Sequence, residues 1–149
     1  MRLSGADVII GGEITKPIDD ALGFIGARAN VKGFLCEYMT AGRVLVMGDP
    51  GPWVCAGMTG GVLYLRLSPE MGLNMAAIER RIASGARVIL SPVAAEDGIN
   101  LHELIQAYAG ELARNHQHQE AEHVRALYNG WEQRFVKILP ARTDETDDV

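Results

Sequence analysis

The feature that most constrains the fold of this chain is a short internal repeat. The pattern Cys-x-x-Met-Thr-x-Gly occupies residues 36–42 and returns 19 residues later at residues 55–61, and an apolar run follows each copy. A period near 20 residues is typical of stacked architectures, in which the next repeat covers each structural unit. The coinciding pairs are Cys36–Cys55, Met39–Met58, Thr40–Thr59, Gly42–Gly61, Val44–Leu63, Leu45–Tyr64 and Val46–Leu65.

The distribution of glycine indicates short strands and tight turns in the first part of the chain. Thirteen of the 17 glycines lie in residues 1–72, and short β-branched runs at residues 7–11, 43–48 and 61–67 separate them without a helical period. A weaker earlier copy of the repeat aligns Gly23 with Gly42 and Ile25 with Val44, again 19 residues apart. We therefore predict a mainly β fold for residues 1–72, a parallel β-helix of about three coils with ~19 residues each.

In such a coil, equivalent residues of successive turns stack about 4.8 Å apart, so like side chains form columns. We expect a structural ladder of Cys36, Met39, Thr40, Cys55, Met58 and Thr59, with Gly42 and Gly61 at corners of positive φ. The alternative is a soft-metal site, because Cys and Met sulfur atoms bind ions such as Cu(I). The stacking distance also falls within disulfide range.

Residues 73–140 have a different pattern, which predicts a helical cap on the coils. Asn74 is placed to cap a short helix that ends near Ser84, and residues 86–93 have the pattern of one more strand. Asn100 and Glu103 have the spacing of a capping box and predict the start of a longer helix. A second helix over residues 119–134 completes an antiparallel pair. Residues 141–149 predict a disordered acidic tail.

Charge and hydropathy exclude several classes of partner. The formal net charge is −5, and the four acids of the tail leave the rest of the chain near −1, without the clustered basic face that nucleic acid requires. No run of 18 apolar residues is present, so we expect no membrane span. Two cysteines and no export signal favour a cytoplasmic location and free thiols.

Other candidate sites are weaker. His116, His118 and His123 do not converge at helical spacing, and we expect an exposed turn rather than a metal site. The glycine-rich residues 48–57 lack the Lys-Ser/Thr of a phosphate loop and favour a corner turn. Arg80 and Arg81 have the pattern of a solvated helix face, and Glu37 has no base or second carboxylate near it in the sequence.

The run CEYMT at residues 36–40 and the run AGMTGG at residues 56–61 resemble the C-terminal GXGXG domain of the glutamate synthase large subunit. Trp131 and the RFVKILP run at residues 134–140 resemble the end of that domain, and Ala41 departs from its usual glycine pair. The resemblance implies a right-handed parallel β-helix that separates catalytic domains. It implies no catalytic, cofactor-binding or metal-binding residue in this chain.

The same resemblance implies partners and cofactors elsewhere. Glutamate synthases carry an amidotransferase with an N-terminal cysteine and a flavin barrel with an iron–sulfur cluster. This chain begins with Met1 and has two cysteines, too few for a cluster by itself. We therefore expect FMN and the cluster on partner domains or subunits, with homo-oligomers possible through an open end of the coils.

The leading hypothesis is a non-catalytic structural subunit or domain of a glutamate-synthase-like oxidoreductase complex in nitrogen assimilation and glutamate biosynthesis. It would position catalytic domains or bridge subunits, and a separately encoded subunit fits the short chain. The alternatives are a stand-alone module that binds a metal or small ligand and the corresponding subunit of a formylmethanofuran-dehydrogenase-like complex. An independent enzyme is the weakest hypothesis, because no nucleophile–base pair emerges.

Overall fold

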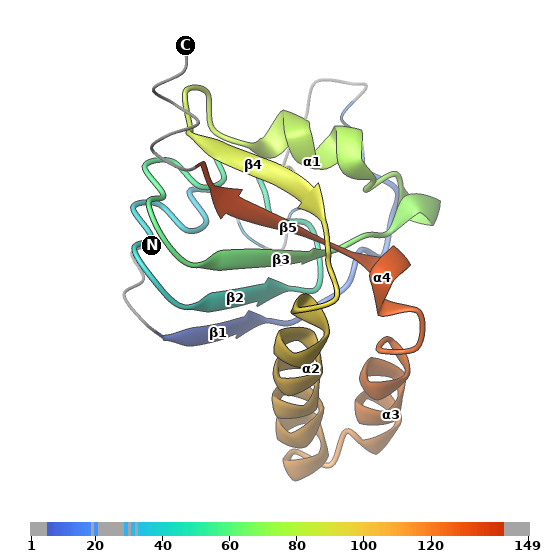
Figure 1. The fold of residues 1–149 in the computed structure, drawn as a ribbon. Coiled ribbons are helices and arrows are strands. Elements are labelled where there is room, and N and C mark those ends of the chain that lie inside the picture. The colour runs from blue at the N-terminus through green and yellow to red at the C-terminus, as the bar shows by residue number, and fades with distance from the viewer. Residues whose placement is uncertain (1–5, 19, 21–28, 30, 32, 142–149) are drawn as a thin grey trace.

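The protein is built on one mixed β-sheet with helices packed against it (Figure 1). The computed structural model describes residues 6–18, 20, 29, 31 and 33–141. Its elements are β1 (Asp7–Ile10), β2 (Arg43–Val46), β3 (Val62–Arg66), η2 (Pro69–Met71), α1 (Met75–Arg81), β4 (Val88–Pro92), α2 (Asp97–Arg114), α3 (His118–Ala126), α4 (Trp131–Arg134) and β5 (Phe135–Pro140). The strand order is β1-β2-β3-β5-β4. Strands β1 to β3 are parallel, whereas β5 is antiparallel to both of its neighbours.

The predicted parallel β-helix is wrong: the named strands form one open sheet of an α/β fold. On one side of the parallel strands, β5 pairs antiparallel with β3, where a β-helix would place its next parallel coil. On the other side, β1 and β2 are 36 residues apart (43 − 7 = 36), so a single 19-residue coil does not join them. The predicted earlier copy at Gly23 and Ile25 and almost all of the predicted acidic tail lie outside the described residues.

The 19-residue register between the two copies of the repeat is confirmed. The paired residues of β2 and β3 are Arg43–Val62, Val44–Leu63, Leu45–Tyr64 and Val46–Leu65. In all four pairs the two residues are 19 positions apart, which is the offset of the sequence repeat. A shift of one residue would turn every side chain of a strand to the opposite face of the sheet, so the hydrophobic pattern specifies this register.

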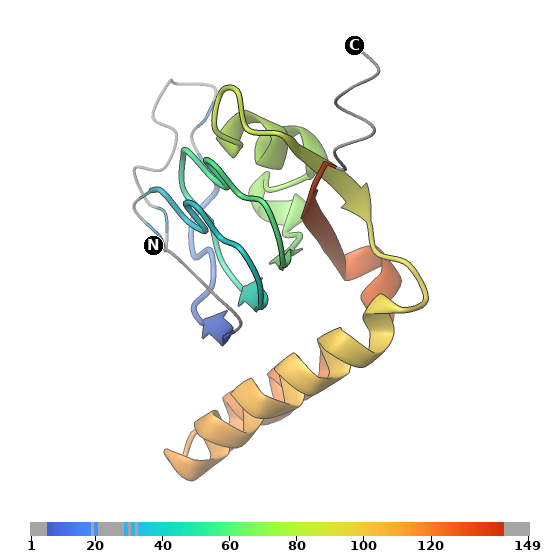
Figure 2. The same ribbon diagram turned by 60° about the vertical axis from the view of Figure 1, so that its left-hand side comes forward.

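Both faces of the sheet are buried, which explains why its central strands are apolar along their length. Val44 and Leu63 lie in one hydrophobic cluster, together with residues of α1. Leu45 and Tyr64 lie in the other cluster, which α2 and α3 complete. In Figures 1 and 2 the α2–α3 pair extends below the sheet, and α1 lies near its upper end.

The helices follow part of the sequence pattern. Asn74 caps α1 as predicted, because its Oδ1 accepts the Ala77 N–H at 3.0 Å. The predicted capping box is wrong, since α2 begins at Asp97 and Asn100 lies inside its first turns. The predicted second helix is divided into α3 and α4, and Gly130 between them has a φ of 74°. None of the helices in the described ranges is long and apolar enough to cross a membrane.

Substitution of Gly60 tests the close stacking of the two repeat copies. A Cβ at Gly60 would lie 1.9 Å from the Thr40 carbonyl oxygen, a backbone atom that cannot move aside alone. We expect Gly60→Ala to lower the free energy of unfolding by about 1–3 kcal/mol, the range typical of overpacking. The measurement is urea unfolding followed by circular dichroism.

The matched control is Gly110→Ala on α2, where the nearest atom to the new Cβ is the Arg114 side-chain nitrogen at 3.7 Å. This change should raise the free energy of unfolding by roughly 0.5–1 kcal/mol, because alanine has the higher helix propensity. Equal effects of the two substitutions would contradict the stacking that the structure shows.

Candidate functional site

Two tandem turns, at residues 34–38 and 53–57, have the same unusual backbone. The φ angles are 59° at Phe34, 59° at Cys36 and 56° at Tyr38, followed by 61° at Trp53, 65° at Cys55 and 68° at Gly57. Left-handed backbone disfavours a residue with a Cβ by roughly 1–2 kcal/mol. Five such residues in two short turns therefore need support from the surrounding structure, and backbone of this kind is often found at functional sites.

Backbone hydrogen bonds between the two turns provide this support. The Phe34 N–H donates to the Pro52 carbonyl at 3.1 Å, the Cys55 N–H to Leu35 at 2.8 Å and the Tyr38 N–H to Ala56 at 2.7 Å. The Thr59 N–H continues the series to the Met39 carbonyl at 2.8 Å. The second turn thus holds the first in place, in the same register as the strands that follow them.

The residues of the predicted ladder occupy two different environments. Cys36, Met39, Cys55 and Met58 are buried in the cluster that also contains α1. Thr40 and Thr59 are exposed instead. Gly42 and Gly61 have φ angles of 100° and 83° at corners of the chain.

The two cysteines are free thiols whose side chains are closed to solvent. A hydrogen bond with Cys36, together with burial, raises the pKa of the Cys55 thiol, which disfavours the thiolate that metals and electrophiles require. Across the described residues, no group of three or more His, Cys, Asp or Glu side chains is placed to hold a metal ion.

The left-handed residues that alternate with the cysteines point to solvent. Phe34, Tyr38 and Trp53, called the aromatic corner below, are 55%, 51% and 52% exposed. Tyr38 lies directly over Gly57, where an added Cβ would come within 2.5 Å of the Tyr38 ring. Large aromatic side chains at a rigid, exposed position have the properties of anchors in protein–protein interfaces.

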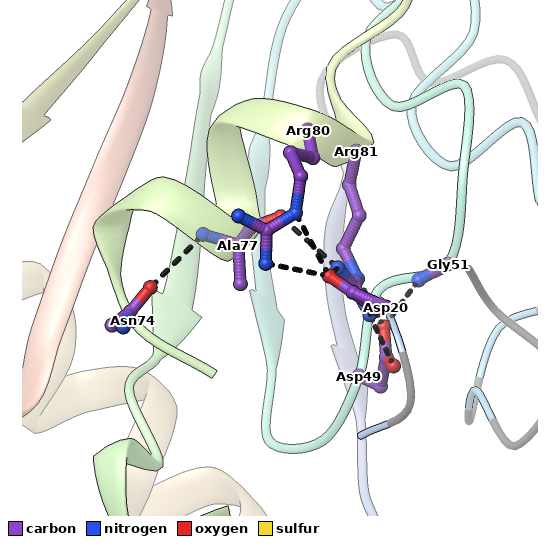
Figure 3. Close-up of polar contacts among 7 residues, drawn as sticks. All are labelled: Asp20, Asp49, Gly51, Asn74, Ala77, Arg80 and Arg81. Atoms are coloured by element: carbon purple, nitrogen blue, oxygen red, sulfur yellow. Dashed lines mark hydrogen bonds and ion pairs between the residues drawn. The ribbon is translucent and has the colours of Figure 1, made fainter. Parts of the chain in front are cut away.

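Beneath the second turn, a buried arginine joins three parts of the chain (Figure 3). Arg81, at the end of α1, has no exposed side-chain surface. Its Nε and one terminal nitrogen donate to the two Asp49 oxygens at 2.7 and 2.9 Å. Its terminal nitrogens also donate to the Asp20 carboxylate at 2.6 and 2.9 Å and to the Ala77 carbonyl at 3.0 Å. All five donors of the guanidinium are therefore used.

The Arg81 cluster fixes the turn that precedes the aromatic corner. Asp49 accepts the Gly51 N–H at 2.9 Å, and the Val54 N–H donates to the Arg81 carbonyl at 2.8 Å. Burial opposes the charge of Arg81, but Asp49 and Asp20 outweigh it and raise the pKa of the guanidinium. The three side chains of the cluster thus remain charged. Loss of any one of them would leave a buried charge without its partner, which is strongly destabilising.

No sequence pattern predicted this cluster. The expectation of a solvated helix face is wrong for Arg81, whereas the Arg80 side chain is 47% exposed. The available signal was helical spacing, since Arg81 follows Ala77 by four residues and Ile78 by three, and both are buried. Its two carboxylate partners lie 32 and 61 residues away along the chain, which no local pattern indicates.

A second polar network, also missed, lies on the opposite face of the sheet. Asp97 accepts the Tyr64 hydroxyl at 2.7 Å, the Lys137 ammonium at 2.6 Å and the Ala94 N–H at 2.7 Å. Burial alone would raise the pKa of Asp97, but the hydrogen bonds from these three donors outweigh it and lower the pKa. Burial and the neighbouring Asp97 raise the pKa of Tyr64. The network ties β3 and β5 to the start of α2.

Asn100 and Glu103, expected as a capping box, extend this network toward the surface. Asn100 donates to the Tyr64 hydroxyl at 3.0 Å, and Arg43 donates to Asn100 at 2.9 Å and to Glu103 at 2.8 Å. Arg43 also binds Asp7 of β1 through two nitrogens. The Arg81 cluster thus joins α1 to the turn at Asp49, and the Asp97 network joins the first turns of α2 to β2, β3 and β5.

The histidines do not form a site with one another. His116 lies in the turn between α2 and α3, His118 begins α3, and their ring centroids are 6.3 Å apart. His123 lies farther along α3, and all three are exposed.

Replacing Arg81 tests whether its cluster stabilises the fold. Arg81→Met leaves two carboxylates in buried positions without their cation, so we expect the free energy of unfolding to fall by about 3–5 kcal/mol. The neighbouring control, Arg80→Met, removes a cation that is 47% exposed and leaves Asp20 its bonds from Arg81, so it should change the free energy of unfolding by less than about 1 kcal/mol. Urea unfolding measures both, and similar losses would contradict the role of burial.

Acid should weaken the same cluster. The hydrogen bond from Arg81 lowers the pKa of Asp20 below its ordinary value of 3.8, with burial opposing and Arg80 assisting. A carboxyl group with a depressed folded-state pKa stabilises the protein above its unfolded-state pKa and loses that contribution as the pH falls through the folded value. We expect the urea midpoint to fall below about pH 4, and to fall less steeply in Asp20→Asn. Parallel pH profiles for the two proteins would argue against this linkage.

Comparisons with known proteins identify the chain's relatives. The family model described as "GXGXG motif" matches residues 25–141. Ferredoxin-dependent glutamate synthase 1 of Arabidopsis thaliana is 31% identical over 134 residues, which cover 83% of this chain and 7% of that protein. The glutamate synthase [NADPH] large chain of Bacillus subtilis is 30% identical over 108 residues, which cover 70% of this chain and 6% of that protein.

A ferredoxin-dependent glutamate synthase of Cyanidium caldarium is 42% identical over 57 residues, which cover 35% of this chain and 4% of that protein. The chain thus spans less than a tenth of the length of these curated relatives. The family match includes both tandem turns, the Arg81 helix and β5. The resemblance to glutamate synthase large chains is confirmed, and the chain belongs to the GXGXG motif family.

Proposed function

We propose that this chain is a non-catalytic structural subunit or domain of a glutamate-synthase-type oxidoreductase complex, in which it positions catalytic domains or bridges subunits. The observation that carries the proposal is the aromatic corner, where two strained turns hold Phe34, Tyr38 and Trp53 outward at 51–55% exposure. Exposed aromatic side chains on a rigid backbone bind a partner without a large loss of conformational entropy.

The comparisons support the choice of partner. The matched relatives are named glutamate synthases, and each is many times longer than this chain. This favours a glutamate-synthase-type complex over a formylmethanofuran-dehydrogenase-like one. We propose that the partner surface belongs to the amidotransferase or flavin-barrel part of such a complex, and that FMN and the iron–sulfur cluster are bound there.

The bonds made by the buried polar side chains of this protein support a structural role. Arg81, Asp97 and Lys137 each bind side chains from other elements and so hold the turns and helices in fixed positions. The buried cysteines contribute apolar packing to the same core. Self-association and a cytoplasmic location remain predictions of the sequence.

Binding to a catalytic chain tests the proposal. The 149-residue protein is immobilised, and a glutamate-synthase-type catalytic chain carrying its flavin and cluster is passed over it. We expect saturable binding that Phe34→Asn/Trp53→Asn weakens at least about tenfold, roughly 1.4 kcal/mol. Asparagine is chosen because it tolerates left-handed backbone better than most residues, so the turns should remain folded.

The control double variant is Ile89→Ala/Ile99→Ala, which removes apolar side chains that are 41% and 71% exposed on β4 and α2. It should bind like the unmodified protein. No binding by the unmodified protein, or equal losses in both double variants, would count against the aromatic corner as the contact surface.

A further inference from the structure

A cavity of about 250 Å³ lies at the carboxyl ends of the three parallel strands, between the sheet and the helix pair. Gly12 follows β1, Met47 follows β2 and Arg66 ends β3. The helices contribute the other side, and the lining residues from them are Tyr108, Gln117, Glu120, His123 and Val124. In α/β sheets, the carboxyl ends of the strands are the usual position of ligand sites. This cavity is separate from the aromatic corner and does not depend on the proposed function.

The cavity combines an apolar base with polar groups around it. Met47 and Val124 are buried and belong to the core between the sheet and the helices. Glu13, Glu120 and His123 are exposed and line the same space. A concave site with apolar walls and a few polar groups is the arrangement typical of small-molecule binding.

Arg66 is the unusual group in this cavity. Its side chain is half-buried, yet within the described ranges its guanidinium makes no hydrogen bond and no ion pair. The other partly or fully buried cations among the described residues each have a carboxylate oxygen close by, at 2.7 Å for Arg43, 2.7 Å for Arg81, 2.6 Å for Arg125 and 2.6 Å for Lys137. Burial lowers the pKa of Arg66, with Glu70 and Glu13 opposing, so partial desolvation is not balanced by a bonded anion.

The surrounding charges determine which ligand would fit. Glu13 and Glu120 line the cavity without bonding to Arg66. A simple anion would meet Arg66 but be repelled by the two carboxylates, and a simple cation would meet the carboxylates but be repelled by Arg66. A molecule with both charges satisfies both groups, and a guanidinium binds a carboxylate through two parallel hydrogen bonds.

We infer that this strand-end cavity binds a small zwitterion with one carboxylate and one ammonium group, the carboxylate on Arg66 and the ammonium on Glu13 or Glu120. The apolar base formed by Met47 and Val124 accommodates the carbon chain that joins the two charges. The cavity, at about 250 Å³, has room for a small molecule of this kind, since a cavity of about 150 Å³ is enough to hold benzene. The binding requires no covalent step and no metal.

Matched small probes test this assignment on the 149-residue protein. β-Alanine carries both charges, whereas propionate and ethylamine each keep one half of the same skeleton. In titrations followed by amide chemical shifts, we expect β-alanine to produce saturable shifts around Met47 and Val124. Propionate and ethylamine should bind at least about tenfold more weakly.

Variants separate the two halves of the site. Arg66→Gln should weaken β-alanine binding at least about tenfold. Arg87→Gln is the matched control, because it removes the same charge from an exposed residue that lines a different cavity. Glu13→Gln and Glu120→Gln, made separately, show which carboxylate binds the ammonium: that variant should weaken β-alanine and strengthen propionate. Circular dichroism verifies that each variant is folded.

Three outcomes would overturn the inference. The first is unchanged β-alanine binding in Arg66→Gln, and the second is equal binding of all three probes. The third is the absence of saturable shifts with every probe. If Arg66→Gln then also has a lower free energy of unfolding, Arg66 pairs with Glu13 or Glu120 in solution and serves the fold alone.

Discussion

The in-register stacking of the two repeat copies is the constraint on which the rest of the structure depends. Backbone hydrogen bonds join residues 34–39 to residues 52–59 and continue directly into the pairing of β2 with β3. Because side chains alternate between faces, this one register decides which residues meet α1 and which meet the helix pair. The cysteines, the aromatic corner and the two hydrophobic clusters all take their positions from it.

Buried charges then fix the covering helices on either side of the sheet. Arg81 holds α1 to the Asp49 turn, and Asp97 holds the start of α2 to Tyr64 and Lys137. A buried polar group that is denied its partners is expensive, so each network permits few alternative arrangements of its elements. Hydrophobic contact alone would tolerate small displacements of the helices, whereas these bonds do not.

The sequence was most informative where partners are close along the chain. The repeat predicted the β2–β3 register, and Asn74 predicted the start of α1, since both depend on residues within about one repeat of each other. The predicted β-helix was wrong because β5 (Phe135–Pro140) pairs with β3 (Val62–Arg66), and no residue pattern in either segment indicates that pairing. Arg81 and Arg66 were missed for the same reason, because their surroundings come from distant elements. Only the fold shows that Arg81 uses all its donors, whereas Arg66 has no hydrogen bond or ion pair with any described residue.

The central position of β5 has a consequence for how the molecule is made. β5 is the last strand of the described chain, yet it lies between β3 and β4, and β4 pairs with β5. Chains leave the ribosome from the N-terminus, so the tandem turns and β2–β3 emerge well before β5 does. Until then β3 has an open edge and β4 lacks this neighbour, and open strand edges promote aggregation. Nascent chains of this protein therefore have an interval of vulnerability that lasts until β5 has emerged and paired with β3 and β4.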